Sequence, residues 1–350
     1  MAKRIGILTG GGDCPGVNAV IRAVVRKCVT VRDVETIGIL RGWRGLLDGL
    51  VTPLDLNSVS GILPRGGTIL RTSRSNPFRT PDGPKRIMEH VARFRLDAVV
   101  CIGGADTLGV ASRMYEEHGL AVVGIPQTID NDIEGTEYAF GFDSTVNIAM
   151  EAIDRLHSTA ESHDRVMIVE VMGRDAGWIA LHAGIASGAD IIIIPEVPAT
   201  IDEVCEAIIR RHDRGKDFSI VVVAEGARIS RRPGEEPMQF TQASQVDEFG
   251  RVRLGGVGTV LGDAIAERTG FETRVVVLGH VQRGGSPTAF DRVLGTRFGV
   301  KAAELALAGD FGKMVALQAN EIVAIPLSEA TRKSRLVPRE LYEVARTFFG

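Results

Sequence analysis

Short apolar runs rich in valine and isoleucine alternate with longer amphipathic segments along this chain. The runs are apolar nearly throughout, as expected of strands that helices cover on both faces of a sheet. The alternation predicts an α/β protein with largely parallel sheets. The expected strands are Arg4–Thr9, Ala98–Ile102, Ala121–Ile125, Arg165–Val171, Asp190–Ile194, Phe218–Ala224 and Arg274–Leu278. The expected helices are Val17–Val29, Ser144–Ser158, Ile201–His212, Val257–Arg268 and Arg292–Ala308.

A chain of 350 residues is longer than one hydrophobic core usually serves, so we expect two lobes. The net charge of −3 gives no electrostatic reason to bind nucleic acid. No apolar run is long enough to cross a bilayer, and the first residues lead directly into a strand pattern. The four cysteines show no metal-ligand or CxxC spacing, so we expect reduced thiols in a cytoplasmic protein.

The strongest candidate for catalysis is the polar segment that follows the expected strand ending at Ile125. Two carboxylates, Asp130 and Asp132, stand two residues apart there, and Thr128 adds a hydroxyl. At the carboxyl end of a strand, Asp130 can accept a proton from a substrate hydroxyl, while Asp132 can hold a metal or orient its neighbour. The alternative is a polar turn that caps the next element, because Asp and Asn are good turn formers.

A glycine-rich turn, Gly10–Gly16, lies between the first expected strand and the first expected helix. Backbone N–H groups in such a turn, followed by a helix N-terminus, favour an anion. No GxxxxGK[ST] follows, and Pro15 stands where GxGxxG needs its last glycine, so neither a Walker A loop nor a dinucleotide fingerprint is present. Phosphate binding is the better interpretation, and a tight structural turn is the alternative.

Two more glycine-rich turns suggest a common binding edge. In Gly66–Arg74, the side chains of Arg71 and Arg74 can clamp a phosphoryl group, although a solvated basic loop explains them equally well. Gly103–Thr107 follows the expected strand ending at Ile102. Turns at one edge of an open sheet line a single crevice, which favours a shared ligand site.

Seven motifs occur in order along nearly the whole chain: GGGDCPG, GGT-x-L-x-x-SR, GG-x-x-T, P-x-TIDND, MGR-x-AGW, AEG and LGH-x-QRGG-x-P. This order resembles the phosphofructokinase family, and most closely its actinobacterial branch, which contains pyrophosphate-dependent and ATP-dependent members. The resemblance implies two similar α/β lobes, each a mostly parallel sheet covered by helices, with the active site in the cleft between them. We expect a donor-binding lobe at residues 1–140 plus 256–305 and a sugar-phosphate-binding lobe at 141–255 plus 306–350.

The resemblance also implies roles for individual residues. Asp130 matches the base that deprotonates the sugar 1-hydroxyl, and Asp132, Thr128 and Arg174 complete the catalytic set. Arg165 matches an arginine supplied by a neighbouring subunit, which implies a homodimer or homotetramer. The residues that match donor contacts are Gly11, Arg74, Gly104, Asp106, Thr107 and Gln127. Those that match sugar-phosphate contacts are Arg165, Met172, Gly173, Arg174, Glu225, Arg274, His280 and Arg283.

Structural roles are the alternative for His280 and for Arg22 and Arg26. Without the family, His280 would be interpreted as a structural histidine, as most histidines outside a site are. Arg22 and Arg26 match effector-contacting arginines of regulated members, but arginines four apart on a helix also form a solvated face. His157 departs from another effector position, so we expect no allosteric control of that kind.

The departures from the family fall on the donor side. Asp106 stands where pyrophosphate users have aspartate and ATP users have glycine, and a carboxylate there would repel the α-phosphate of a nucleotide. Gln127 replaces the lysine of pyrophosphate-type members. Ala105 stands where the family has a carboxylate linked to magnesium, which leaves Asp132 as the candidate for Mg²⁺. Arg71 replaces a glycine.

The resemblance implies a Mg²⁺-dependent phosphotransferase that moves a phosphoryl group to fructose 6-phosphate or a related sugar phosphate, and Asp106 favours pyrophosphate as the donor. Phosphoryl transfer needs mainly positioning and charge neutralisation, which glycine turns and arginines supply. One alternative is an ATP-dependent 6-phosphofructokinase. Another is a sugar-phosphate-binding paralogue with little catalysis, which Ala105, Gln127 and Arg71 would favour. A nicotinamide-dependent dehydrogenase is disfavoured by the missing GxGxxG.

Overall fold

The computed structural model describes residues 3–230, 234–246, 249–250 and 252–349. The chain forms two compact units. Unit 1 comprises Met1–Ser144 and Arg283–Ser334, and unit 2 comprises Thr145–Gln282 and Arg335–Gly350. Each unit is therefore built from two separated stretches of sequence. No helix in the described part of the chain is both long and apolar enough to span a membrane.

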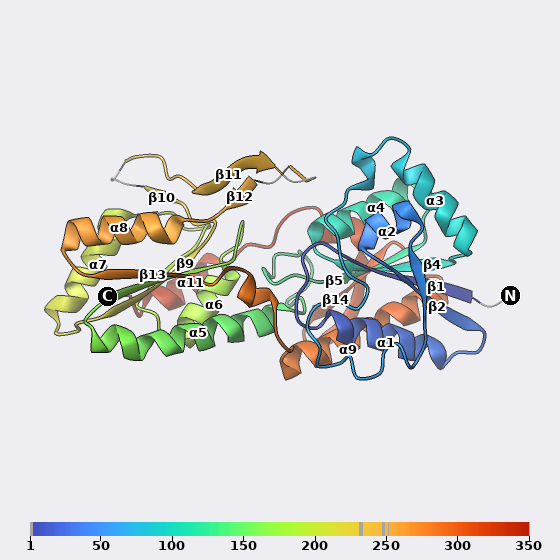
Figure 1. Cartoon of the computed structure of the whole chain (residues 1–350), viewed down its shortest axis with the longest axis horizontal. Helices are drawn as coiled ribbons and strands as arrows, with labels where there is room; N and C mark the ends of the chain where they lie inside the picture. Colours follow the sequence, from blue (N-terminus) through green and yellow to red (C-terminus); the bar gives the residue numbers. More distant parts are fainter. Residues whose placement is uncertain (1–2, 231–233, 247–248, 251, 350) are drawn as a thin grey trace. The chain divides into compact units, whose positions relative to one another are not determined.

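Unit 1 contains a seven-stranded sheet in the order β15-β14-β5-β4-β1-β2-β3 (Figure 1). Its five inner strands run parallel, and the two edge strands, β3 and β15, pair antiparallel with their neighbours. All side chains of β4 are buried, which explains its uninterrupted apolar sequence. The strands are β1 Lys3–Gly10, β2 Val34–Ile39, β3 Val51–Leu54, β4 Ala98–Gly103, β5 Val122–Pro126, β14 Lys313–Gln318 and β15 Glu321–Pro326.

Helices cover both faces of the unit 1 sheet (Figure 1). On one face α1 packs closely against α9, where a Cβ added at Gly299 would lie 2.7 Å from the Val20 carbonyl oxygen. Only glycine permits this approach of the two helix backbones. The helices of unit 1 are α1 Val17–Val29, α2 Gly42–Asp48, the 3₁₀ turn Pro77–Arg79, α3 Gly83–Phe94, α4 Ala105–His118, α9 Ala289–Ala308 and α10 Leu327–Ala330.

Unit 2 contains a parallel four-stranded sheet in the order β13-β6-β9-β7. Two small sheets, β8–β10 and β11–β12, accompany it. The strands are β6 Val166–Val171, β7 Ile191–Ile193, β8 Ala199–Thr200, β9 Ser219–Ala224, β10 Ile229–Ser230, β11 Thr241–Val246, β12 Val252–Leu254 and β13 Thr273–Val277. The helices are α5 Phe142–Ser162, which begins in unit 1, α6 Trp178–Ala186, α7 Ile201–Asp213, α8 Val257–Thr269, the 3₁₀ turn Gly279–Arg283 and α11 Arg339–Arg346.

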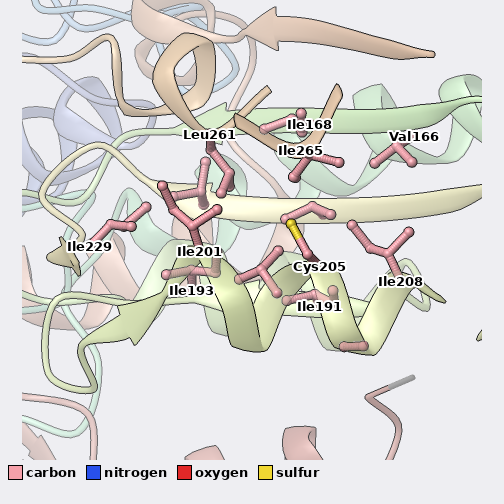
Figure 2. Close-up of a cluster of buried hydrophobic side chains, with 14 of the residues drawn as sticks. Val166, Ile168, Ile191, Ile193, Ile201, Cys205, Ile208, Ile229, Leu261 and Ile265 are labelled. Carbon is pink, nitrogen blue, oxygen red and sulfur yellow. The ribbon is translucent and has the colours of Figure 1, made fainter. Parts of the chain in front are cut away.

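The core of unit 2 lies where α7 and α8 pack on its sheet (Figure 2). Ile201 and Ile208 of α7 and Leu261 and Ile265 of α8 are buried there, beside Ile168 of β6. Burying such side chains contributes about 1.5–3 kcal/mol each. The amphipathic spacing of both helices thus fixes them to this sheet.

The prediction of an α/β fold with two mostly parallel sheets covered by helices is confirmed. Every expected strand and helix is present, and α1 has the expected bounds. The units are divided differently from the expected lobes. Residues 256–282 belong to unit 2, because α8 and β13 pack with β6. Residues 306–334 belong to unit 1, because β14 pairs with β5 and completes its sheet.

Candidate functional site

The expected donor-binding turns meet at one edge of the unit 1 sheet. β5, β4 and β1 are neighbours in that sheet and run parallel, so their carboxyl ends lie together. The turns after them begin at Gln127, Gly104 and Gly11. This is the edge at which open parallel sheets bind ligands.

The first glycine turn is tied to the second. Gly11 has φ +84°, and its N–H donates to the Ser73 carbonyl at 3.0 Å. The Thr72 hydroxyl donates to the Gly11 carbonyl at 2.7 Å. Arg74, expected to contact the donor, is exposed on the second turn. These bonds bring Gly11 and the segment before Arg74 together, as the prediction of a shared site requires.

Arg71 occupies a left-handed backbone conformation, with φ +58°. Its carbonyl accepts a hydrogen bond from the Thr9 hydroxyl at 2.7 Å, which holds the turn. The positive φ would favour glycine, the residue that the family resemblance leads us to expect here, since a side chain in this region costs about 1–2 kcal/mol. Arg71 therefore carries local backbone strain.

The third glycine turn surrounds the side chain of Thr107. Gly104 precedes α4, Asp106 lies in its first turn, and Thr107 is buried. A Cβ added at Gly103 would lie 2.5 Å from the Thr107 Cβ, and one added at Gly10 would lie 2.6 Å from its hydroxyl. The two glycines therefore make room for Thr107 between the ends of β1 and β4.

Two side chains bind carbonyl groups of the first glycine turn. Gln127, which is 3% exposed, donates from Nε2 to the Gly12 carbonyl. Arg283 donates from Nη1 to the Asp13 carbonyl at 3.3 Å. Arg283 was expected among the sugar-phosphate contacts, and in unit 1 it lies beside the turn expected to bind the donor.

The Asp130 turn is organised by Thr128. Its hydroxyl donates to Asp132 Oδ1 at 3.0 Å and accepts the backbone N–H of Asp130 at 3.0 Å. Asn131 has φ +51°, and its Oδ1 accepts the Ala139 N–H at 3.0 Å. Sequence reasoning gave Asn131 no role, although asparagine between two aspartates signals a residue that tolerates this conformation. The turn holds Asp130 and Asp132 in defined positions.

In unit 2, four expected sugar-phosphate residues gather at the carboxyl ends of β6 and β9. Glu225 donates its backbone N–H to the Val171 carbonyl at 2.8 Å, and Gly226 donates to the Gly173 carbonyl at 3.0 Å. Gly173 has φ +137°, which favours glycine there. The residues brought together are Met172, Gly173, Arg174 and Glu225, and His280 follows the neighbouring strand β13.

Glu196 holds the far end of the same loop, a role that sequence reasoning missed. Its carboxylate accepts the N–H of Gly177 at 3.0 Å and the N–H of Val337 at 2.9 Å. The Trp178 indole donates to the Arg335 carbonyl at 3.0 Å, and the Arg335 guanidinium lies 4.2 Å from the Trp178 ring centroid. The residues from Arg335 onward thus brace the segment that follows Arg174.

Arg165 and Arg274 lie at the opposite end of that sheet. Arg165 precedes the first residue of β6 and pairs with Glu272 at 2.9 Å, and Arg274 forms an ion pair with the same carboxylate. The Arg165 side chain, followed by Arg274, lowers the pKa of Glu272. One strand length, about 20 Å for six residues, separates this end from the Met172 loop. The structure therefore does not bring these two arginines to the other sugar-phosphate residues of their own chain.

Asp291 is a buried carboxylate that sequence reasoning also missed. It lies in the first turn of α9 and accepts hydrogen bonds from the Ser144 N–H at 2.8 Å and the Ser144 hydroxyl at 2.6 Å. Burial raises its pKa to about 6. The sequence signal is Thr288 three residues earlier, an N-cap residue whose hydroxyl accepts the Asp291 N–H.

A cavity of about 450 Å³ lies near the start of β2 in unit 1. It is lined mainly by apolar side chains, including Val29, Val34, Pro53 and Phe94. None of the expected site residues lines it. The charged and glycine-rich turns at the carboxyl edge of the sheet therefore lie apart from this cavity.

Comparisons with known proteins identify the family of this chain. The phosphofructokinase family matches residues 4–306. A pyrophosphate–fructose 6-phosphate 1-phosphotransferase from Amycolatopsis mediterranei is 56% identical over 99% of this chain and 100% of its own length. An ATP-dependent 6-phosphofructokinase 2 from Streptomyces coelicolor is 50% identical over 99% of this chain and 100% of its own length.

Solved structures share the fold. Phosphofructokinase from Pichia pastoris matches with a TM-score of 0.81 and 33% identity, over 99% of this chain and 36% of the Pichia chain. A pyrophosphate-dependent phosphofructokinase from Marinobacter aquaeolei matches with a TM-score of 0.82 and 22% identity, over 97% of this chain and 86% of its own, and supports the fold alone. On the family match, the full-length relatives and the fold, this chain belongs to the phosphofructokinase family.

Proposed function

We propose that this protein transfers a phosphoryl group from pyrophosphate to the 1-hydroxyl of fructose 6-phosphate or a related sugar phosphate. The observation that carries the proposal is the Asp130 turn, held by Thr128 at the same sheet edge as the glycine turns. A base and an anion cradle on neighbouring strand ends are what phosphoryl transfer requires. Family membership supports the reaction class.

In the proposed reaction, Asp130 accepts the proton of the sugar 1-hydroxyl as that oxygen attacks the donor phosphorus. A new O–P bond forms, the bridging P–O bond of pyrophosphate breaks, and inorganic phosphate leaves. Thr128 keeps the backbone at Asp130 and the carboxylate of Asp132 in place. The N–H groups of the first glycine turn would stabilise the charge on the transferred group.

Pyrophosphate is the favoured donor because of Asp106. Its carboxylate lies in the first turn of α4, next to the glycine turn. A negative charge there would oppose the further phosphate of a nucleotide while tolerating the shorter donor. An ATP-dependent reaction is the alternative, since relatives named for either donor have similar identities, 56% and 50%.

We further propose that Mg²⁺ assists the reaction, bound mainly by donor phosphate oxygens. Among the described residues, no group of three or more His, Cys, Asp or Glu side chains could hold a metal ion. This fits Mg²⁺, which binds through one or two carboxylates plus substrate phosphates and keeps several waters. Asp132 is the candidate carboxylate, and Ala105 offers none. The ion would neutralise charge on the donor.

Arg165 and Arg274 support an oligomer. Because they lie together at the amino end of the unit 2 sheet, we propose that both act in the site of a neighbouring copy, in a homodimer or homotetramer. Charge-assisted bonds from two guanidinium groups suit a sugar phosphate. We also place the protein in the cytoplasm, because its four cysteines are free thiols.

The test is formation of fructose 1,6-bisphosphate from fructose 6-phosphate and Mg²⁺, with pyrophosphate and ATP compared in parallel. We expect turnover with pyrophosphate alone, and loss of about 10²–10⁴-fold in kcat in the Asp130→Asn control. Turnover with ATP alone would refute the donor assignment.

A sugar-phosphate-binding paralogue is the second candidate. The observation that favours it is Ala105, because the family's magnesium-linked carboxylate is absent there. Product formation with any donor would exclude it. Fructose 6-phosphate binding without product from either donor would establish it instead.

A further inference from the structure

We propose that Gln127 is a positioning residue for the phosphoryl donor, because it fixes the first glycine turn instead of contacting the donor. The inference rests on the proposed function, under which that turn binds the donor. It changes the role expected for Gln127 from a donor contact to a clamp on Gly12.

The side chain of Gln127 spans the end of one strand. Gln127 follows β5, and its backbone N–H donates to the Gly103 carbonyl at 3.0 Å. β4 lies between β5 and β1, yet Nε2 reaches the Gly12 carbonyl in the turn after β1. One residue thus joins both glycine turns.

The clamp sets the direction of a backbone amide. No peptide bond in the described chain is cis, and in a trans peptide the carbonyl points opposite to the following N–H. With its carbonyl held by Gln127, Gly12 turns the N–H of Asp13 away from Gln127. Arg283 holds the Asp13 carbonyl, which likewise turns the N–H of Cys14 away from Arg283. Consecutive amides oriented in this way make an anion site.

The same geometry argues against direct donor contact by Gln127. Gln127 is only 3% exposed, and its amide nitrogen already donates a hydrogen bond to the Gly12 carbonyl. Oε1 is an acceptor and cannot bond to a phosphate oxygen, which is an acceptor too. The second N–H of Nε2 belongs to a residue that is only 3% exposed.

The decisive variant is Gln127→Met, which keeps length and shape but donates no hydrogen bond. We expect kcat/KM for the donor to fall about tenfold, as for loss of one positioning hydrogen bond, with KM for fructose 6-phosphate unchanged. Amide hydrogen exchange at Asp13 and Cys14 should be faster. Gln318→Met is the matched control, because Gln318 donates from Nε2 to the Gly135 carbonyl at 2.9 Å on an exposed part of unit 1.

A second variant, Gln127→Asn, keeps an amide in the buried position but is one methylene too short to reach Gly12. It should show the same loss. Wild-type donor constants in both variants, or an equal rise in KM for both substrates, would overturn the proposal.

Amide exchange separates this inference from the proposed function. If the wild type turned over neither donor, the proposed function would fail, while exchange at Asp13 and Cys14 would still report on the clamp. Exchange unchanged in Gln127→Met would refute the clamp whatever the activity.

Discussion

Ala105 is the first residue of α4, and Gln127 is the first residue after β5. A carboxylate and an ammonium are expected at these two positions in relatives. Because one expected group is negative and the other is positive, the absence of both leaves the local net charge unchanged. Where the resemblance leads us to expect a lysine, Gln127 bonds to the Gly12 carbonyl as a neutral donor. These two substitutions should therefore be coupled.

The coupling predicts different outcomes for single and double reversions. Gln127→Lys alone would bury a positive charge without a partner. A buried charge that lacks its partner destabilises the folded state by several kcal/mol, so this variant should have lower activity. Ala105→Glu with Gln127→Lys should be faster with pyrophosphate than either single variant. Rates of the four proteins form a double-mutant cycle, and additive effects would contradict the coupling.

Asp291 predicts a pH dependence of stability. Burial raises its pKa from 3.8 to about 6, so the folded state binds a proton more tightly than the unfolded state. Its stabilising contribution is therefore complete below about pH 4 and is lost as pH rises through about 6. Relative to Asp291→Asn, the wild type should lose up to about 3 kcal/mol of unfolding free energy over that range. Urea unfolding of both proteins across the range checks this, and parallel pH curves would contradict it.

Among the elements, the loop after β6 has supports at both ends. Gly226 bonds to Gly173 near its start, and Glu196 binds Gly177 near its end. Glu196 also binds Val337, so the loop depends on a segment distant in sequence. If this loop contacts the sugar phosphate, the position of its backbone in the site depends on Glu196.

Glu196→Ala should therefore raise KM for fructose 6-phosphate about tenfold, because one carboxylate accepting two backbone N–H groups is lost. KM for the donor should stay the same, since the donor turns belong to unit 1. Initial rates with each substrate varied in turn provide the measurement. Glu203→Ala, which removes a capping-box carboxylate on α7, is the control for a general loss of stability. Equal shifts in both KM values would contradict a local role.

The inner strands were predictable because burial on both faces demands continuous apolar sequence, as in β4 and β9. The β14–β15 hairpin was not predicted. Its turn residues Ala319 and Asn320 have φ +47° and +65°, and an alanine in that conformation gives no turn signal in the sequence. The pairing of β14 with β5 joins segments far apart in sequence, which local patterns do not encode.

The candidate site residues were predicted from the order of the motifs, and residue types alone left alternatives open at most of them. The motifs did not indicate which residues contact one another. Arg165 and Arg274 both pair with Glu272. Arg283 and Gln127 bond to carbonyl groups of the first glycine turn. Such contacts depend on strand order and register, which short motifs do not specify.

For the whole molecule, the position of Arg165 predicts sites shared between copies. Asp130→Asn and Arg165→Ala should each be nearly inactive alone. When the two variants are mixed at random as dimers, about half of the dimers contain one chain of each variant. One of the two sites in such a dimer has both Asp130 and Arg165, so about one quarter of the wild-type activity should return. Activity after co-expression or mixed refolding measures this.

A mixture of Asp130→Asn with Asp132→Asn is the control. Both changes affect the same turn of the same chain, so no intact site can form in the hybrid. Recovery in this control, or none with Arg165→Ala, would contradict the shared site.

The division of each unit into two stretches has a consequence for how the protein is made. A chain emerges from the ribosome with its N-terminus first and folds in that order where it can. All four strands of the unit 2 sheet lie within Thr145–Gln282, whereas the unit 1 sheet needs β14 beside β5. Until residues 313–326 are synthesised, β5 is an unprotected sheet edge, the kind of surface at which nascent chains aggregate. The synthesis of unit 1 therefore starts first, but its sheet is completed only after the unit 2 sheet. Until then, β5 is the sheet edge at which nascent chains are most prone to aggregate.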